Sequence, residues 1–222
     1  MLAGHYSASF AAKTLAPRLP WWAVLLAAQA VDIVLDVLLL FGIERVSLDF
    51  SLPSNPLVIE YVPFTHSLLG NAGWAVLAYF VTMRCLQNRR AAFIVSLTVL
   101  SHWFLDVIIH RPDMTLHGAE PRLGTSLWNY PAFANGLELS LLVLGLLGYL
   151  AVARPTRREA RAAWLLTLLL VATQVYAIVA PPPPTTTAMA VSLFASYLSA
   201  AGIAAWLERR ACTADQRDGL AL

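Results

Sequence analysis

The segment AAFIVSLTVLSHWFLDVIIH, residues 91–110, decides the fold class of this chain. It contains no Lys or Arg. A helix of about 20 apolar residues rises about 30 Å, which matches the thickness of the hydrocarbon core of a bilayer. The segment therefore predicts a transmembrane helix. It also carries three side chains that a bilayer disfavours, His102, Asp106 and His110, and such residues inside a span are usually functional.

Apolar segments of similar length lie on both sides of this one, so the sequence predicts an all-α bundle of about six transmembrane helices. The chain is 59% hydrophobic and only 13% charged, whereas a soluble domain usually has about 25% charged residues. Residues 1–207 are interpreted as a single transmembrane domain and residues 208–222 as a cytoplasmic tail. The predicted spans are residues 20–43, 66–86, 91–110, 133–153, 162–180 and 188–207.

The Lys and Arg residues alternate between successive connections, and this pattern predicts the orientation of the helices. Connections 44–65, 111–132 and 181–187 hold only three of them, whereas the segments on the other side hold most of the rest. Both termini are therefore expected in the cytoplasm. The three connections that hold few Lys or Arg residues are expected outside. The net charge of +2 gives no reason to expect nucleic acid as a partner.

Acidic and histidine side chains gather in the outward halves of the predicted spans, where no Lys or Arg offers a counter-charge. His102 and Asp106 are four residues apart, so they share one helical face and can bind one ion; Asp32 and Asp36 form a second such pair. Imidazole and carboxylate together suit zinc, and also iron or manganese. The sequence predicts a divalent metal site whose candidate ligands are His66, His102, Asp106, Asp36 and Asp32.

Four short elements in this order resemble a known family. They are Gly4-His5-Tyr6, the acids Asp32 and Asp36, Thr65-His66-Ser67-Leu68, and Ser101-His102 followed by Asp106. Over roughly residues 4–110 the chain resembles the small bacterial inner-membrane proteins described as membrane-bound metal-dependent hydrolases of the LexA-regulated type. The resemblance implies a multi-pass inner-membrane protein, hydrolase activity, and His5 as a further metal ligand. His5 precedes the first predicted span, so it can reach the site only if residues 4–17 re-enter the bundle as a short helix.

We therefore expect a hydrolase in which a metal-bound water attacks a lipid, or a lipid-linked phosphate ester or amide. His110 or Glu138 would act as the general base, and membrane lipid would supply the substrate. Three other functions stay open. The facing Asp and His/Asp pairs also suit a divalent-metal transporter. The polar cluster could instead hold helices together by hydrogen bonds alone, or serve a di-iron oxidative enzyme.

Overall fold

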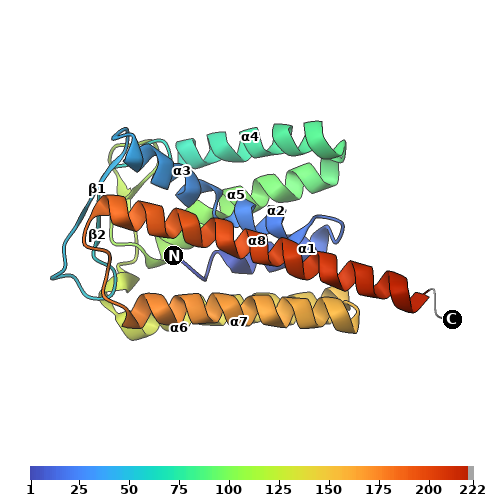
Figure 1. Ribbon diagram of the computed structural model, residues 1–222. Coiled ribbons are helices and arrows are strands. Elements are labelled where there is room, and N and C mark those ends of the chain that lie inside the picture. The colour runs from blue at the N-terminus through green and yellow to red at the C-terminus, as the bar shows by residue number, and fades with distance from the viewer. Residues whose placement is uncertain (220–222) are drawn as a thin grey trace.

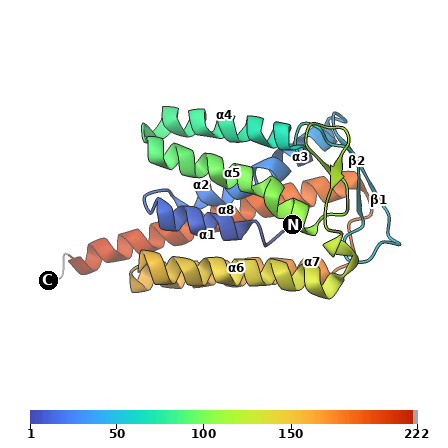
Figure 2. The same ribbon diagram turned by 180° about the vertical axis from the view of Figure 1, so that it is seen from behind.

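The computed structural model describes residues 1–219, with side chains as far as residue 210, and it is mostly helical. Helices line up along one direction and two small antiparallel sheets lie at one end, here called the strand end (Figures 1 and 2). The helices are α1 (Tyr6–Leu15), α2 (Trp21–Ala28), α3 (Ala30–Leu40), α4 (Leu68–Leu86), α5 (Arg89–Ile109), α6 (Pro131–Ala153), α7 (Arg157–Val179) and α8 (Thr186–Gly219). The strands are β1 (Arg45–Leu48), β2 (Leu57–Tyr61), β3 (Met114–Thr115) and β4 (Arg122–Leu123), and a 3₁₀ turn spans Leu127–Asn129.

Four helices, α5, α6, α7 and α8, are long and apolar enough to cross a membrane, and α2 with α3 makes a fifth if the bent pair counts as one span. The sequence predicted about six. The predicted span 66–86 does form a helix, α4, but Asn71, Arg84 and two glycines dilute its apolar character. Helix α8 also runs without a break past residue 207, where the sequence analysis began the tail.

The outward surfaces of the long helices are rich in large apolar side chains, as lipid-facing surfaces are. Phe80 of α4, Phe104 of α5, Leu144 of α6 and Val179 of α7 are all exposed. A water-soluble monomer rarely shows so much apolar surface. The exposed faces therefore agree with helices that lie in a membrane.

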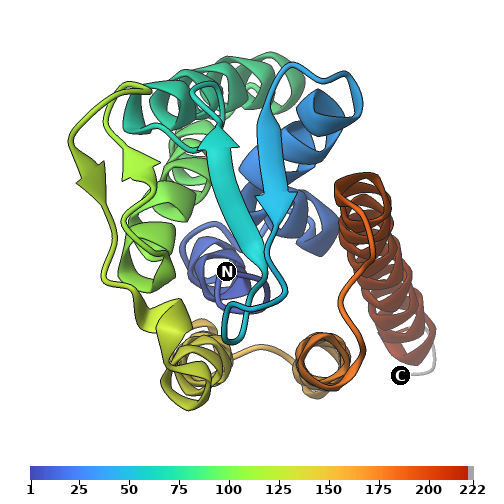
Figure 3. The same cartoon turned by 90° about the vertical axis from the view of Figure 1, so that its left-hand side faces the viewer.

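Helix α1 lies in the centre of the bundle, and the other helices surround it (Figure 3). Its Phe10 side chain is fully buried and packs edge-on against Trp21, with the ring centroids 5.2 Å apart. At the end of α1, the buried Lys13 ammonium donates to the carboxylate of Glu208 at 2.8 Å and to the carbonyl of Leu19 at 2.7 Å. The short re-entrant helix that His5 needs is thus present, and its one cation is paired.

Helices α2 and α3 meet at Gln29 with a bend of 59°. Because α2 ends at Ala28, the carbonyl of Ala28 has no partner in a continuing helix and is available to a side chain. The bend also sets the direction of α3, which carries Asp32 in its first turn. This break therefore matters for the site described next.

Candidate metal centre

Six His and Asp side chains from four parts of the chain meet inside the bundle, towards the strand end. They are His5 just before α1, Asp32 in α3, His66 just before α4, His102 and Asp106 in α5, and His110 directly after α5. These residues are called the His/Asp cluster below. Five of the side chains are at most 3% exposed and Asp32 is 15% exposed. By proximity they form two groups of three ligand atoms, each within 4.8 Å of one another.

Asp106 is the centre of the cluster, because each of its carboxylate oxygens faces two histidines. Oδ1 lies 3.1 Å from Nε2 of His5 and 3.4 Å from Nε2 of His110. Oδ2 lies 3.1 Å from Nε2 of His102 and 3.6 Å from Nε2 of His66. One carboxylate thus contacts all four rings.

Asp32 joins the cluster from the opposite helix. Its Oδ1 lies 3.3 Å from Nε2 of His102 and 3.5 Å from Nε2 of His66, the same two nitrogens that face Oδ2 of Asp106. Its Oδ2 accepts a hydrogen bond of 3.2 Å from the hydroxyl of Tyr197 in α8. Asp32 therefore closes a ring of four ligand atoms with His66, His102 and Asp106.

Hydrogen bonds fix the protons on two of the imidazole rings. Nδ1 of His102 lies 3.0 Å from the carbonyl oxygen of Ala28, at the bend, and Nδ1 of His110 lies 3.1 Å from Oδ1 of Asp113. A carbonyl and a carboxylate only accept hydrogen bonds, so both Nδ1 atoms carry a proton. In a neutral ring the lone pair is then on Nε2, the atom that faces Asp106, as in most metal-bound histidines.

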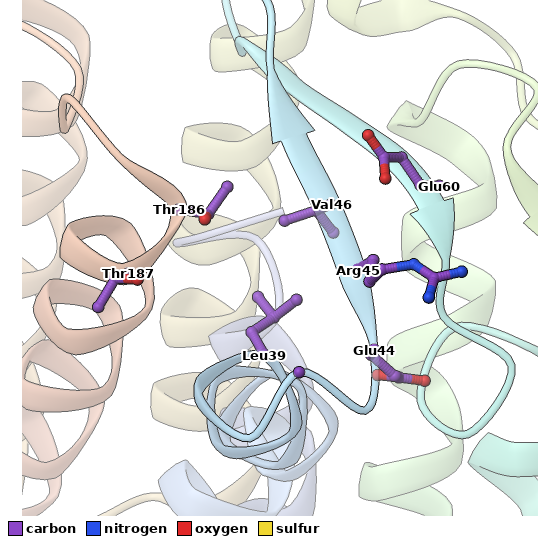
Figure 4. A pocket seen from close by; sticks show the side chains of 8 residues that line it. Leu39, Glu44, Arg45, Val46, Glu60, Thr186 and Thr187 are labelled. Carbon is purple, nitrogen blue, oxygen red and sulfur yellow. The ribbon is translucent and has the colours of Figure 1, made fainter.

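The third ring, His66, is held by a chain of two hydrogen bonds. The Thr65 hydroxyl donates to Oε2 of Glu44 at 2.6 Å, so its oxygen is free to accept from Nδ1 of His66 at 3.0 Å. Glu44 itself lines a cavity of about 180 Å³ between the two-stranded sheet of β1 and β2 and the start of α8 (Figure 4). Its carboxylate also accepts from the backbone N–H groups of Phe64 and Thr65. Nε2 of His66 again points to the carboxylates.

These contacts bring lone pairs of nitrogen and oxygen face to face in a buried place. Among the buried side-chain atoms without a hydrogen-bond partner are both ring nitrogens of His5, Nε2 of His102 and Oδ2 of Asp106. Buried polar atoms are nearly always satisfied, so these unpartnered atoms are suited to bind a cation. Two ligands on a tetrahedral zinc ion, each about 2.0–2.1 Å from the metal, lie about 3.3 Å apart. The separations of 3.1–3.6 Å match this, so the residues fit a bound metal ion.

The N-terminal residues lie inside the bundle beside the cluster, and not at a cytoplasmic surface as the sequence analysis expected. The Met1 amino group contacts Oδ1 of Asp106 at 2.6 Å. Glu138, expected as a general base, accepts from the backbone N–H groups of Leu2 and Gly4 at 2.7 and 3.3 Å. Glu138 therefore holds the segment that leads into His5.

The structure brings together most of the residues that the sequence selected as ligands: His5, Asp32, His66, His102 and Asp106. His110 was expected as a general base, but its Nε2 lies 3.4 Å from Oδ1 of Asp106, close enough for both atoms to bind one ion. Asp36, expected as a ligand, lies one turn beyond Asp32 and belongs to neither group. Its side chain is buried, and its Oδ2 has no hydrogen-bond partner.

Sequence reasoning missed three residues that support the cluster: Asp113 and Tyr197 contact His110 and Asp32, and Glu44 acts on His66 through Thr65. Asp113 follows His110 by three residues, a spacing that could have suggested the pair. Tyr197 is a hydroxyl in the middle of an apolar helix, which is a weaker signal. Glu44 is 20 residues or more from its partners in the chain, so the sequence around it gives no sign of these contacts.

Comparison of the chain with protein-family models, with curated proteins and with solved structures gives no match.

Proposed function

We propose that this protein is a metal-dependent hydrolase embedded in the bacterial inner membrane, with the His/Asp cluster as its active site. The observation that carries the proposal is the place of Nε2 of His102, which lies 3.3 Å from Oδ1 of Asp32 and 3.1 Å from Oδ2 of Asp106. Both this nitrogen and Oδ2 of Asp106 are buried without a hydrogen-bond partner, at separations that two ligands of one zinc ion would have. The motif resemblance around His5, His66 and His102 supports the same reading.

We also propose that the strand end faces outward. The Arg-rich turn between α4 and α5, the turn between α6 and α7, and the far end of α8 all lie at the opposite end of the bundle (Figure 1). Basic residues near the ends of spans favour the cytoplasmic side. The His/Asp cluster would then lie in the outer half of the membrane.

The chemistry of the proposed reaction is hydrolysis by a metal-bound hydroxide, since water bound to zinc has a pKa of about 7. The residues of the chain hold the ligands in place and take up the proton.

The proposed substrate is a lipid, or a lipid-linked phosphate ester or amide. Two features support this class: the cluster lies among helices with apolar outer faces, and hydrolysis of a polar ester in water would not need such a position.

The test is to purify the full chain in detergent and measure bound metals and hydrolysis of fluorogenic phospholipids in mixed micelles. The wild type should hold zinc, iron or manganese, and a chelator should abolish turnover until the metal is restored. His102→Ala and Asp106→Asn should lose both metal and turnover.

Asp36→Asn is the matched control, because Asp36 is buried on the same helix as Asp32 but lies outside the cluster. It should keep the metal. If neither the wild type nor Asp36→Asn binds any of the three metals after reconstitution, the proposal is wrong and the cluster only packs helices. Metal binding with uptake into vesicles and no hydrolysis would favour a transporter.

A further inference from the structure

We infer that the His/Asp cluster is a two-metal centre, in which the carboxylate of Asp106 bridges one closed and one open metal position. The inference rests on the proposed metal-dependent function and adds the number, sharing and asymmetry of the ions. It follows from which histidine faces which oxygen, and not from the number of ligands alone.

The first position is the ring of four ligand atoms around Oδ2 of Asp106. Nε2 of His66 and Nε2 of His102 each face this oxygen and Oδ1 of Asp32, over four separations of 3.1–3.6 Å. These four separations are close to the edge of a tetrahedron around a zinc ion, which is about 3.3 Å. Four protein ligands would fill such an ion and would leave no place for water.

The second position lies at the other oxygen of Asp106. Nε2 of His5 and Nε2 of His110 lie 3.1 and 3.4 Å from Oδ1. With Oδ1 they supply three ligands, the number that catalytic zinc sites use beside a water. This is the open position, where a reactive water would bind.

The two positions must be neighbours, because they share one carboxylate. The ring of His5 also stacks on that of His102, with centroids 3.7 Å apart and planes 11° apart, so a ligand of one position packs on a ligand of the other. Two-metal hydrolytic centres hold their ions about 3.5–4 Å apart and stabilise both the attacking and the leaving oxygen of a displacement reaction. That geometry suits a phosphate ester better than an amide.

The proximity groups mix these two sets, since they place His5 with Asp32 and His66 with Asp106. The division by carboxylate oxygen instead follows the direct contacts between the Nε2 atoms and the carboxylate oxygens, which are 3.1–3.6 Å long.

The test is metal stoichiometry of the full chain, stripped with chelator, reconstituted with excess Zn²⁺ and desalted. The wild type should retain two ions per chain, and so should Asp36→Asn. His110→Gln and His5→Gln should each retain one, because they remove a ligand of the open position only. Asp106→Asn should retain the fewest, because it removes the bridge.

A second measurement needs no variant. Wild type reconstituted with Mn²⁺ should give the electron paramagnetic resonance spectrum of two exchange-coupled ions, and His110→Gln the spectrum of a single ion. One ion per chain in the wild type, with an uncoupled spectrum, overturns the two-metal centre, and persistent hydrolysis would then leave the proposed function standing. Two coupled ions without hydrolysis of any lipid substrate would support the centre and remove the proposed function instead.

Discussion

Glu44 contacts no metal-binding atom, yet it determines how His66 is presented. Its carboxylate fixes the hydroxyl of Thr65, and that hydroxyl fixes Nδ1 of His66. Groups that orient a metal ligand in this way are worth about 10–100-fold in metal affinity. Thr65 and Glu44 are therefore positioning residues, and their effect on the metal can be separated from a loss of fold.

Thr65→Val should weaken Zn²⁺ binding by about 10–100-fold, because the ring of His66 loses the acceptor that fixes its tautomer. Thr65→Ser keeps the hydroxyl and should restore the affinity. Competition with a chromophoric chelator measures both. Glu44→Gln should resemble Thr65→Val, whereas Glu60→Gln, an exposed residue that lines the same cavity, should bind zinc as the wild type does. Equal affinities for Thr65→Val and Thr65→Ser would contradict this role.

The choice between Asp32 and Asp36 shows where the sequence stops being informative about the site. The two residues are one turn apart on the same face, so the spacing marks both as candidates. The bend at Gln29 determines which of the two acids joins the cluster. It places the start of α3 beside α5, where the Ala28 carbonyl contacts His102. No proline or glycine near Gln29 indicates the bend in the sequence. The sequence therefore predicted the types of ligand but not which of the two acids would be one.

At the scale of elements, the position of α1 depends on one close approach. A Cβ atom on Gly145 of α6 would lie 3.0 Å from Cα of Ser7, and 3.2 Å from the Ser7 carbonyl oxygen. That is too close for the two helices to keep their positions, so α1 would have to move. Because His5 immediately precedes α1, the metal centre should respond to a change at Gly145.

Gly145→Val should lower the stability of the purified protein by about 1–3 kcal/mol through overpacking, and it should reduce the zinc bound. Gly148 lies one turn further along α6 and has open space around it. Gly148→Val is therefore a matched control that should keep the wild-type stability and the wild-type zinc content. Thermal unfolding followed by tryptophan fluorescence, with metal analysis, measures the pair. Equal melting temperatures for the two variants would mean that α1 does not need this contact.

The long helices were predictable because each combines length with apolar character; span 91–110 became α5, Arg89–Ile109. Helix α1 was foreseen only as a condition for His5, because its 10 residues are too few to stand out as a span. The small sheets of the strand end were not foreseen. Val58, Ile59 and Tyr61 of β2 do favour a strand, but the strands are short and their pairing depends on where the helix ends bring them.

At the scale of the whole molecule, the proposed orientation can be tested through cysteines. Cys85 is exposed at the end of α4, away from the strand end, and Ser51 is exposed in the connection between β1 and β2. In a Cys212→Ser background, a membrane-impermeant maleimide should label Ser51→Cys in intact spheroplasts. Cys85 should be labelled only after the membrane is opened. The reverse pattern would show that the strand end faces the cytoplasm.

The metal ligands come from four separated parts of the chain, and this has a consequence for the life of the protein in the cell. An ion that binds only the folded bundle stabilises it by about 4 kcal/mol when free metal exceeds the dissociation constant a thousandfold. Losing that ion loosens contacts between His5, α3, α4 and α5 at once, and proteases act on the loosened form. We therefore expect the cellular level of this protein to follow metal supply: starvation should shorten its half-life at constant transcription, and Asp106→Asn should be short-lived even in metal-rich medium.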